Sequence, residues 1–170
     1  QFGPLAERLV DLDLNVDLVL GVPRGALPVT RPVADALDVP LGIAVAKKMG
    51  APDNPEYAIG AAASDGSVYL DEETIDRLGI DEAYVERERE RAAETAREKA
   101  DTYRQGEPYD VEGKTVVVVD DGVATGATLT ACVRMLREKG AERIVVAVPV
   151  GSPDSLAELE GEADDVVALA

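Results

Sequence analysis

Two adjacent carboxylates, Asp120 and Asp121, stand between four consecutive valines and a short loop of glycine, alanine and threonine. An unbroken apolar run such as 116–119 is typical of a central parallel strand that is buried on both faces. The loop after the acids leads into an amphipathic segment, Leu129 to Lys139, which we predict to be a helix. The carboxylates should therefore lie at the carboxyl end of a strand, where open α/β sheets bind their ligands.

The loop between this strand and this helix can receive a phosphate. The first backbone N–H groups of a helix have no partner within the helix, and the helix dipole favours an anion there. Small residues let the anion approach the backbone, and the hydroxyls of Thr125 and Thr128 add donors. Two carboxylates beside a phosphate would repel it unless they bind another part of the same ligand. Since an ionised carboxylate only accepts hydrogen bonds and a sugar diol offers two donors, the pattern predicts a site for a phosphorylated ribose.

The segment 120–128 resembles, at every position, the phosphoribosyl pyrophosphate (PRPP) motif of type I phosphoribosyltransferases. In that family the acid pair holds the ribose hydroxyls, and the loop after it cradles the 5′-phosphate. The resemblance extends over 17–169 and is nearest to a group of predicted phosphoribosyltransferases whose acceptor is unknown. It implies that the ribose 5-phosphate part of PRPP is bound by Asp120, Asp121, Gly122, Val123, Ala124, Thr125, Gly126, Ala127 and Thr128.

Two other interpretations of this segment explain less of it. A buried strand, a turn and a helix whose start is stabilised by acids would account for one acid and one threonine. That interpretation does not account for adjacent acids together with two threonines and two glycines. A receiver domain also has acids at a strand end, but it places them early in the chain, whereas three strand-like segments precede the pair here.

A second turn of small residues, Pro23-Arg24-Gly25, follows the first predicted strand, Asp17 to Val22. By itself this turn is equally consistent with a tight strand–helix connection. Together with the PRPP motif it resembles the pyrophosphate loop of the same family, in which backbone N–H groups and a basic side chain hold the leaving group. Arg24 suits this role because a guanidinium can bind phosphate oxygens through two parallel hydrogen bonds.

Two of the chain's five lysines, Lys47 and Lys48, are adjacent at the end of the second predicted strand, Pro40 to Ala46. Adjacent ammonium groups repel each other and are best tolerated beside an anion. The alternative is one lysine in solvent and one paired with a carboxylate. Related enzymes carry a basic residue here that reaches the pyrophosphate, which implies a pyrophosphate-binding pair with Lys48 as the catalytic member. The stretch Met49 to Asn54 would then be a mobile lid that shields the ribose from water.

The resemblance implies a PRPP-dependent pentosyltransferase, in which a nitrogenous base displaces pyrophosphate from the anomeric carbon, or the reverse. Arg24, Lys48 and Mg²⁺ would stabilise the departing pyrophosphate, while Asp120 and Asp121 hold the sugar. The resemblance also implies that Mg²⁺ is carried by PRPP, so we expect no direct protein ligands to the metal. The alternative is a catalytically inactive regulatory protein of the same fold that senses PRPP or a nucleotide.

The acceptor base is less closely defined. Enzymes for 6-oxopurines carry an acid two residues before the second glycine of the motif, and here that position is Ala124. This argues against hypoxanthine and guanine and leaves adenine, uracil, orotate or another acceptor. We expect a hood or lid over the base to come from an insertion at about 50–80 and from the loop 150–153. Members of the related group continue beyond the position of Ala170, so we expect part of the hood to lie outside this sequence.

For the fold, we predict one α/β domain over 1–170 with a three-layer, doubly wound, mainly parallel central sheet of about five strands. The insertion should add a hairpin from 57–63 and 67–70, which turns at Asp65-Gly66. A helix from Asp81 to about Tyr103 carries Glu/Arg pairs and should lie on the sheet with a solvated outer side. The remaining predicted segments are helices at 5–12, 27–37, near 71 and at 154–160, and strands at 144–149 and 165–169.

Composition limits the possible partners. The 170 residues include 34 acids and 17 bases, a net charge of −17, and the acids are dispersed. Such a surface resembles halophilic proteins, whose self-repulsion is screened by salt, and it argues against a nucleic-acid partner. The absence of histidine excludes a histidine base or histidine-ligated metal, and the single cysteine, Cys132, is expected to fill the core. Without a visible membrane span or signal peptide, we expect a cytoplasmic homodimer that binds PRPP and a small nitrogenous acceptor.

Overall fold

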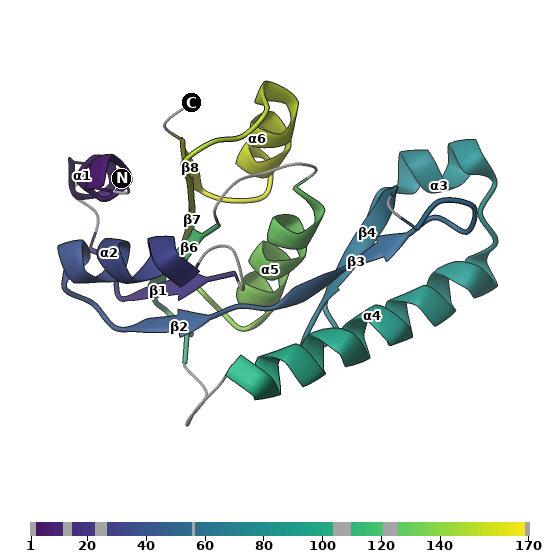
Figure 1. Ribbon diagram of the computed structural model, residues 1–170, viewed down its shortest axis with the longest axis horizontal. Helices are drawn as coiled ribbons and strands as arrows, with labels where there is room; N and C mark the ends of the chain where they lie inside the picture. The colour runs from purple at the N-terminus through teal and green to yellow at the C-terminus, as the bar shows by residue number, and fades with distance from the viewer. Residues whose placement is uncertain are drawn as a thin grey trace.

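The computed structural model describes residues 3–11, 15–22, 27–55, 57–103, 110–120 and 126–168. Five parallel strands form the main sheet in the order β2-β1-β6-β7-β8, and three antiparallel strands form a second sheet in the order β3-β4-β5 (Figure 1). The strands are β1 (Leu18–Gly21), β2 (Leu41–Ile43), β3 (Ala46–Gly50), β4 (Ala58–Ala63), β5 (Val68–Leu70), β6 (Thr115–Val119), β7 (Arg143–Val148) and β8 (Asp165–Ala168). The predicted α/β class, the five-stranded parallel sheet and the inserted hairpin are confirmed.

Helices cover both faces of the main sheet. The helices α1 (Gly3–Asp11) and α2 (Leu27–Leu37) lie on one face, and α5 (Ala127–Glu138) and α6 (Pro153–Glu160) lie on the other. The valines of β6 alternate between the two cores: Val117 and Val119 face α1 and α2, whereas Val116 and Val118 face α5. This alternation explains the unbroken apolar run, because both sides of the strand are buried.

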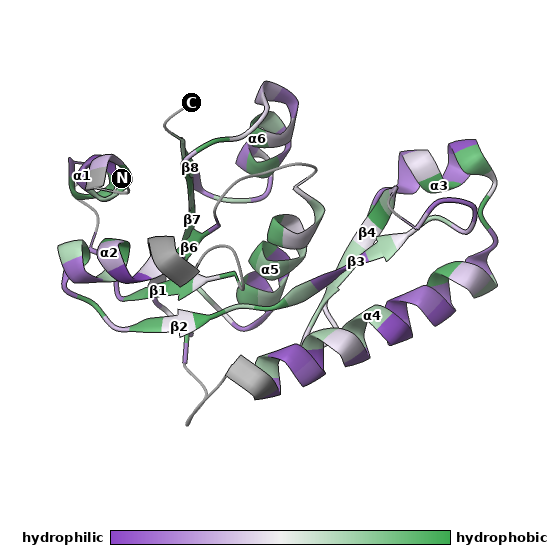
Figure 2. Cartoon of the chain, in the orientation of Figure 1, coloured by the Kyte–Doolittle hydropathy of each residue, from purple (hydrophilic) through white to green (hydrophobic). Residues whose placement is uncertain are grey.

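The second sheet forms an insert with its own helices, α3 (Glu72–Leu78) and α4 (Glu82–Tyr103). One face of this sheet packs on α4 through Met49, Ala62, Val85 and Ala92. The outer side of α4 is hydrophilic over much of its length (Figure 2), as expected for a solvated helix on a sheet. Among the described residues, no helix is both long and apolar enough to cross a membrane.

The helix α5 lies between the two sheets. Its residues Leu129, Cys132 and Val133 pack on the main sheet, whereas Ala127 and Ala131 pack on Ala61 of β4. Further along α5, the Arg134 guanidinium lies 5.0 Å from the centre of the Tyr69 ring, and its Nε is 3.1 Å from Glu162. The Ser67 hydroxyl donates to the Glu138 carboxylate at 2.7 Å. The insert is therefore attached to the main sheet through α5.

The strand predicted over Pro40 to Ala46 is wrong in one respect. The main-sheet strand β2 ends at Ile43, and after Ala44 and Val45 the chain enters β3, which pairs antiparallel with β4. Lys47 and Lys48 consequently lie inside β3 and do not close the second strand. Met49 belongs to β3 too and is fully buried, so it cannot be part of an exposed lid, and the loop begins at Ala51.

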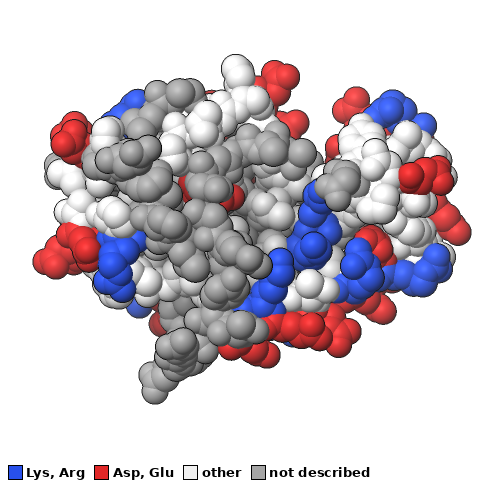
Figure 3. All heavy atoms as spheres, viewed as in Figure 1, with Lys and Arg blue, Asp and Glu red and all other residues white. Residues whose placement is uncertain are grey.

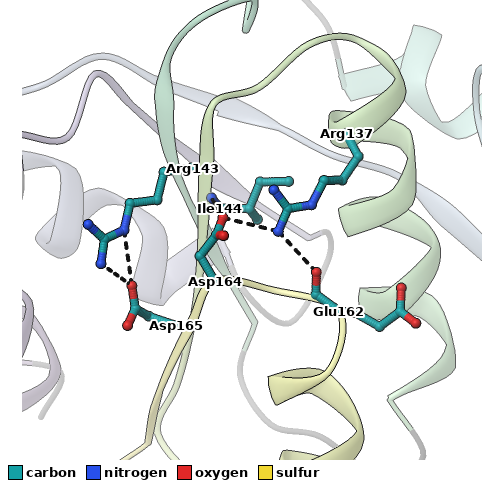
Figure 4. A network of polar contacts seen from close by, with 6 residues as sticks. All are labelled: Arg137, Arg143, Ile144, Glu162, Asp164 and Asp165. Atoms are coloured by element: carbon teal, nitrogen blue, oxygen red, sulfur yellow. Dashed lines mark hydrogen bonds and ion pairs between the residues drawn. The ribbon is translucent and has the colours of Figure 1, made fainter.

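A network of charged side chains lies where β7 and β8 begin (Figure 4). Arg143 pairs with Asp165, the first residue of β8, and Arg137 pairs with Asp164 at 3.0 Å. The Asp164 carboxylate also accepts the Ile144 N–H at 2.7 Å. These contacts lie at the amino ends of the strands, opposite the carboxyl ends, and we interpret them as fixing the position of β8 in the sheet.

Candidate functional site

The strand order reverses at β1 and β6, which makes their carboxyl ends a topological switch point. From β1 the chain crosses through α2 to β2 on one side, and from β6 it crosses through α5 to β7 on the other. In open α/β sheets a crevice for ligands forms at such a point. Gly21 is paired with Val119, and the Val22 N–H donates to the Val119 carbonyl at 3.0 Å. The carboxyl ends of β1 and β6 therefore lie at the same level of the sheet.

Several predicted site residues lie outside the described residues. They are Pro23, Arg24, Gly25, Asp121, Gly122, Val123, Ala124 and Thr125. The described members are Lys47, Lys48, Asp120, Gly126, Ala127 and Thr128. For each of the two predicted loops, the structure therefore describes the strand that precedes it and the helix that follows it.

Asp120 is half-buried at the end of β6, and its N–H donates to the Ala147 carbonyl at 3.2 Å. Its charge also acts on the Cys132 thiol in α5. Burial, and after it the charges of Asp120 and Asp65, raise the pKa of Cys132 from 9.0 to about 12. Asp120 therefore lies close to the first turns of α5, where the sequence predicts the phosphate. Cys132 is fully buried among the apolar core, as predicted.

The amino end of α5 is shaped by Gly126. This residue is the N-cap and has a φ of 79°, in the left-handed region that side chains other than glycine rarely adopt. Glycine offers no side chain to cap the helix, and Ala127 and Leu129 of the first turn are buried. Backbone N–H groups and the half-exposed Thr128 are therefore what this end of α5 presents to a ligand.

The two lysines of β3 point to opposite faces of the strand, because successive side chains alternate. Lys48 is paired with Ala61, which packs on Ala127 at the start of α5. Lys47 lies on the other face with Met49, which packs on α4. Of the two, Lys48 is thus on the side of α5. Lys47 instead acts on Glu88 of α4, whose pKa its charge helps to lower.

Gly50, the last residue of β3, is held by α4 at both of its polar backbone groups. The Tyr84 hydroxyl donates to the Gly50 carbonyl at 2.8 Å. The Glu88 carboxylate accepts the Gly50 N–H, and its pKa is lowered first by a hydrogen bond from Arg91 and also by this backbone bond. A Cβ at position 50 would lie 2.3 Å from the Pro55 carbonyl oxygen, so glycine is required for the returning loop to approach.

Sequence reasoning missed Tyr84 and Glu88, which it placed on a solvated helix. Their spacing of four residues puts them on one side of α4, and Glu88 is only 13% exposed. A tyrosine and a glutamate on the same helical face were the available signal, but their partner, Gly50, is 34 positions away from Tyr84 in the sequence.

Basic side chains gather on this part of the molecule. On the face shown in Figure 3, Lys and Arg lie over the insert in the region of β3 and α4, and acidic side chains follow the outer edge of α4. Arginines of α4 are in part neutralised by acids of the same helix, as in the pairs Arg89–Glu86 and Arg91–Glu88.

The strand order reverses at β1 and β6, a carboxylate follows β6, and a helix with a glycine N-cap lies beside it; this arrangement is typical of open α/β folds that bind phosphate-bearing ligands. The family model of the phosphoribosyl transferase domain matches residues 3–168. The chain belongs to this family, which confirms the predicted resemblance.

Known proteins of similar sequence and structure support the assignment to this family. "Putative phosphoribosyl transferase Rv0571c" of Mycobacterium tuberculosis is 40% identical over 168 residues, 98% of this chain and 38% of that protein. The crystal structure of TT1426 from Thermus thermophilus has a TM-score of 0.82 at 40% identity, and the match covers 99% of this chain and 80% of that one. Purine phosphoribosyltransferase from Pyrococcus horikoshii shares the fold, with a TM-score of 0.56 at 21% identity over 98% of this chain and 78% of that one. This chain thus spans well under half the length of its mycobacterial relative.

Proposed function

We propose that this protein transfers the 5-phosphoribosyl group of PRPP to a nitrogenous base and releases pyrophosphate, or catalyses the reverse reaction. The observation that carries the proposal is the arrangement at the switch point. Asp120 directly follows β6, before the loop to α5, and Lys48 lies on the face of β3 that packs against the start of the same helix. A sugar-binding carboxylate and a phosphate-binding cation thereby flank one helix terminus.

In this proposal each group has one task. The carboxylates of Asp120 and Asp121 accept hydrogen bonds from the ribose hydroxyls, and the backbone of 122–128 binds the 5′-phosphate. Arg24 and Lys48 bind the pyrophosphate, on which negative charge grows as the bond to the anomeric carbon breaks. The nitrogen of the base attacks that carbon, and the ribose passes through a state with positive charge that the acid pair favours.

Mg²⁺ would neutralise charge on the pyrophosphate and so make it a better leaving group. Oxygen atoms are the ligands that Mg²⁺ prefers, and a pyrophosphate supplies several of them. We therefore propose that PRPP carries the ion into the site and that this chain contributes the surrounding charges.

The decisive experiment measures pyrophosphate release from PRPP and Mg²⁺ with a panel of bases that includes adenine, uracil and orotate. We expect turnover with one base. In Asp120→Asn and in Asp121→Asn, both this turnover and the PRPP affinity measured by calorimetry should be lost. Saturable PRPP binding without turnover for any base would favour a PRPP sensor instead. Unchanged PRPP affinity in both variants would refute the assignment of the site.

The pyrophosphate half of the site has a separate test. Arg24→Ala should weaken the binding of PRPP and pyrophosphate and spare ribose 5-phosphate, because only the first two ligands carry the group that Arg24 is proposed to hold. Equal losses for all three ligands would assign a structural role to the turn 23–25.

A further inference from the structure

Gly21, the last residue of β1, lies in unusually close contact with Thr30 of α2. A Cβ atom at position 21 would lie 2.1 Å from the Thr30 hydroxyl oxygen and 3.0 Å from the Thr30 Cβ. Rotation of the Thr30 side chain about χ1 would not relieve the second of these contacts, because Cβ stays in place. The φ of Gly21 lies outside the left-handed region, so it is the approach of α2 that requires a glycine here.

Thr30 is a polar side chain on the inner face of α2, and it is only 2% exposed. Val33 and Ala34, three and four positions later, are buried on the same face and belong to one core cluster with Val19 of β1. Of these three residues of α2, Thr30 lies nearest the amino end of the helix. An apolar side chain could fill this place without the cost of removing a hydroxyl from water, so packing alone does not explain a threonine.

The end of β1 is held from both of its neighbouring strands. The Gly21 carbonyl accepts the Ala44 N–H at 3.0 Å, directly after β2. On the other side, the Val22 N–H donates to the Val119 carbonyl of β6 at 3.0 Å. Gly21 is therefore a fixed point of the sheet, and the contact with Thr30 holds the first turns of α2 against it.

Residues 22–26 alone connect Gly21 to Leu27, the first residue of α2. In the proposed function this short connection carries Arg24, so the separation of β1 and α2 limits how its groups can meet the pyrophosphate. We propose that Thr30 is a positioning residue for pyrophosphate binding, which acts by setting that separation through its contact with Gly21. The inference rests on the proposed function, because it takes the pyrophosphate to bind between these two elements.

The hydroxyl is the part of Thr30 that allows such a close approach. A Cα–H group and an oxygen can approach to about 3.3–3.6 Å, whereas two carbon atoms prefer about 3.5–4.0 Å. A methyl group in the place of the hydroxyl would therefore push the start of α2 away from Gly21. Small displacements of this kind matter, since a misplacement of about 1 Å can reduce activity about a hundredfold.

The test compares Thr30→Val and Thr30→Ser in calorimetric titrations with pyrophosphate and Mg²⁺ and, separately, with ribose 5-phosphate. Thr30→Val has nearly the shape of threonine but no hydroxyl, and it should weaken pyrophosphate binding about tenfold. Thr30→Ser keeps the hydroxyl and should bind pyrophosphate as the wild type does, although the lost methyl group lowers its melting temperature. Both variants should keep the affinity for ribose 5-phosphate, which lacks the pyrophosphate group.

Val33→Ala is the matched control for a purely structural effect. It removes buried carbon atoms from the next turn of the same helical face, so it should lower the melting temperature and leave both affinities unchanged. A second pair of variants tests the contact itself. Gly21→Ala should weaken pyrophosphate binding because its Cβ clashes with Thr30, and Gly21→Ala combined with Thr30→Ala should recover part of the loss.

Three results would overturn the inference and leave the proposed function in place. The first is pyrophosphate affinity in Thr30→Val equal to that of the wild type, and the second is an equal loss for pyrophosphate and ribose 5-phosphate. The third is a double variant in which the losses from Gly21→Ala and Thr30→Ala simply add. A wild type that binds no pyrophosphate would overturn the proposed function together with this inference.

Discussion

The Tyr84 hydroxyl donates a hydrogen bond to the Gly50 carbonyl at 2.8 Å and so joins α4 to the last residue of β3. Gly50 lies two positions after Lys48, and its N–H is held by Glu88 of the same helix. The orientation of Lys48 toward α5 therefore depends on a helix that packs against the opposite face of the strand.

Removal of this hydroxyl should affect both stability and ligand binding. We expect Tyr84→Phe to lower the free energy of unfolding by about 1 kcal/mol, the usual worth of one hydrogen bond. It should also weaken pyrophosphate binding several-fold, because the end of β3 is less firmly held, while ribose 5-phosphate affinity stays the same. Denaturant unfolding and calorimetry measure the two effects.

Tyr69→Phe is the matched control, because it removes a hydroxyl from the insert for which the described residues provide no hydrogen bond. It should change neither quantity. A Tyr84→Phe protein that is less stable and binds pyrophosphate normally would show that the bond to Gly50 is structural only.

The two lysines of β3 should differ in their effect on pyrophosphate. Lys48→Ala removes the cation on the α5 side and should reduce pyrophosphate affinity about tenfold or more, the equivalent of a hydrogen bond to a charged group. Lys47→Ala removes a cation that faces Glu88 and should change the affinity less than about threefold. Titration calorimetry with pyrophosphate and Mg²⁺ compares the two. Equal losses would mean that both side chains reach the anion.

Stability should depend strongly on salt. With 34 acids and 17 bases dispersed along the chain, low ionic strength leaves like charges unscreened, and their repulsion favours unfolding. Between low salt and molar KCl we expect the melting temperature to rise by roughly 10 °C or more, given that a domain of this size gains about 2–4 °C per kcal/mol. Sorbitol at equal osmolality should not reproduce the rise. A melting temperature that stays flat would refute the halophilic assignment and leave the transferase proposal untouched.

The thiol of Cys132 should be unreactive in the folded protein. Its pKa is raised from 9.0 to about 12, mainly by burial, so at pH 9 the folded protein should contain roughly several hundredfold less thiolate than the unfolded chain. Reaction with a disulfide reagent should therefore proceed only through unfolding, and guanidinium should restore the full rate.

The raised pKa of Cys132 also makes the stability of the folded protein depend on pH. The pKa of the Cys132 thiol is higher in the folded protein than in the unfolded chain. The stabilisation that comes from burying the neutral thiol is therefore complete below pH 9 and is lost as the pH rises from about 9 toward 12. Cys132→Ala should lack this component of alkaline destabilisation. A difference between the two proteins that does not change with pH would contradict the burial of a protonated thiol.

The parts of the fold that follow from local patterns were predictable. The valines 116–119, followed by acids, a small-residue loop and an amphipathic segment, predicted β6 and α5. The break between β2 and β3 was not predictable, because 41–46 contains no proline or turn signal after Gly42 and reads as one apolar run. What divides it is the pairing of β3 with β4, a tertiary contact.

The same limit applies to the candidate site. The sequence pointed to the pair Lys47-Lys48 because the chain otherwise contains few lysines, and the family resemblance selected Lys48 of the two. The strand register places Lys48 on the side of α5. The contribution of Tyr84 and Glu88 depends on a backbone group that carries no sequence signal of its own. Residues that act through another residue's backbone are the ones that pattern reasoning misses.

The position of α5 between the two sheets has a thermodynamic consequence. Eight of its twelve residues are buried, and they serve the main sheet and the insert at the same time. An anion bound at the start of α5 should thus protect amide groups of both sheets from hydrogen exchange to a similar degree, by about 2.7 kcal/mol at a concentration roughly one hundred times its Kd. The main sheet and the insert would then unfold as one cooperative unit, and a ligand bound at the start of α5 would stabilise the distant insert as much as the sheet beside it.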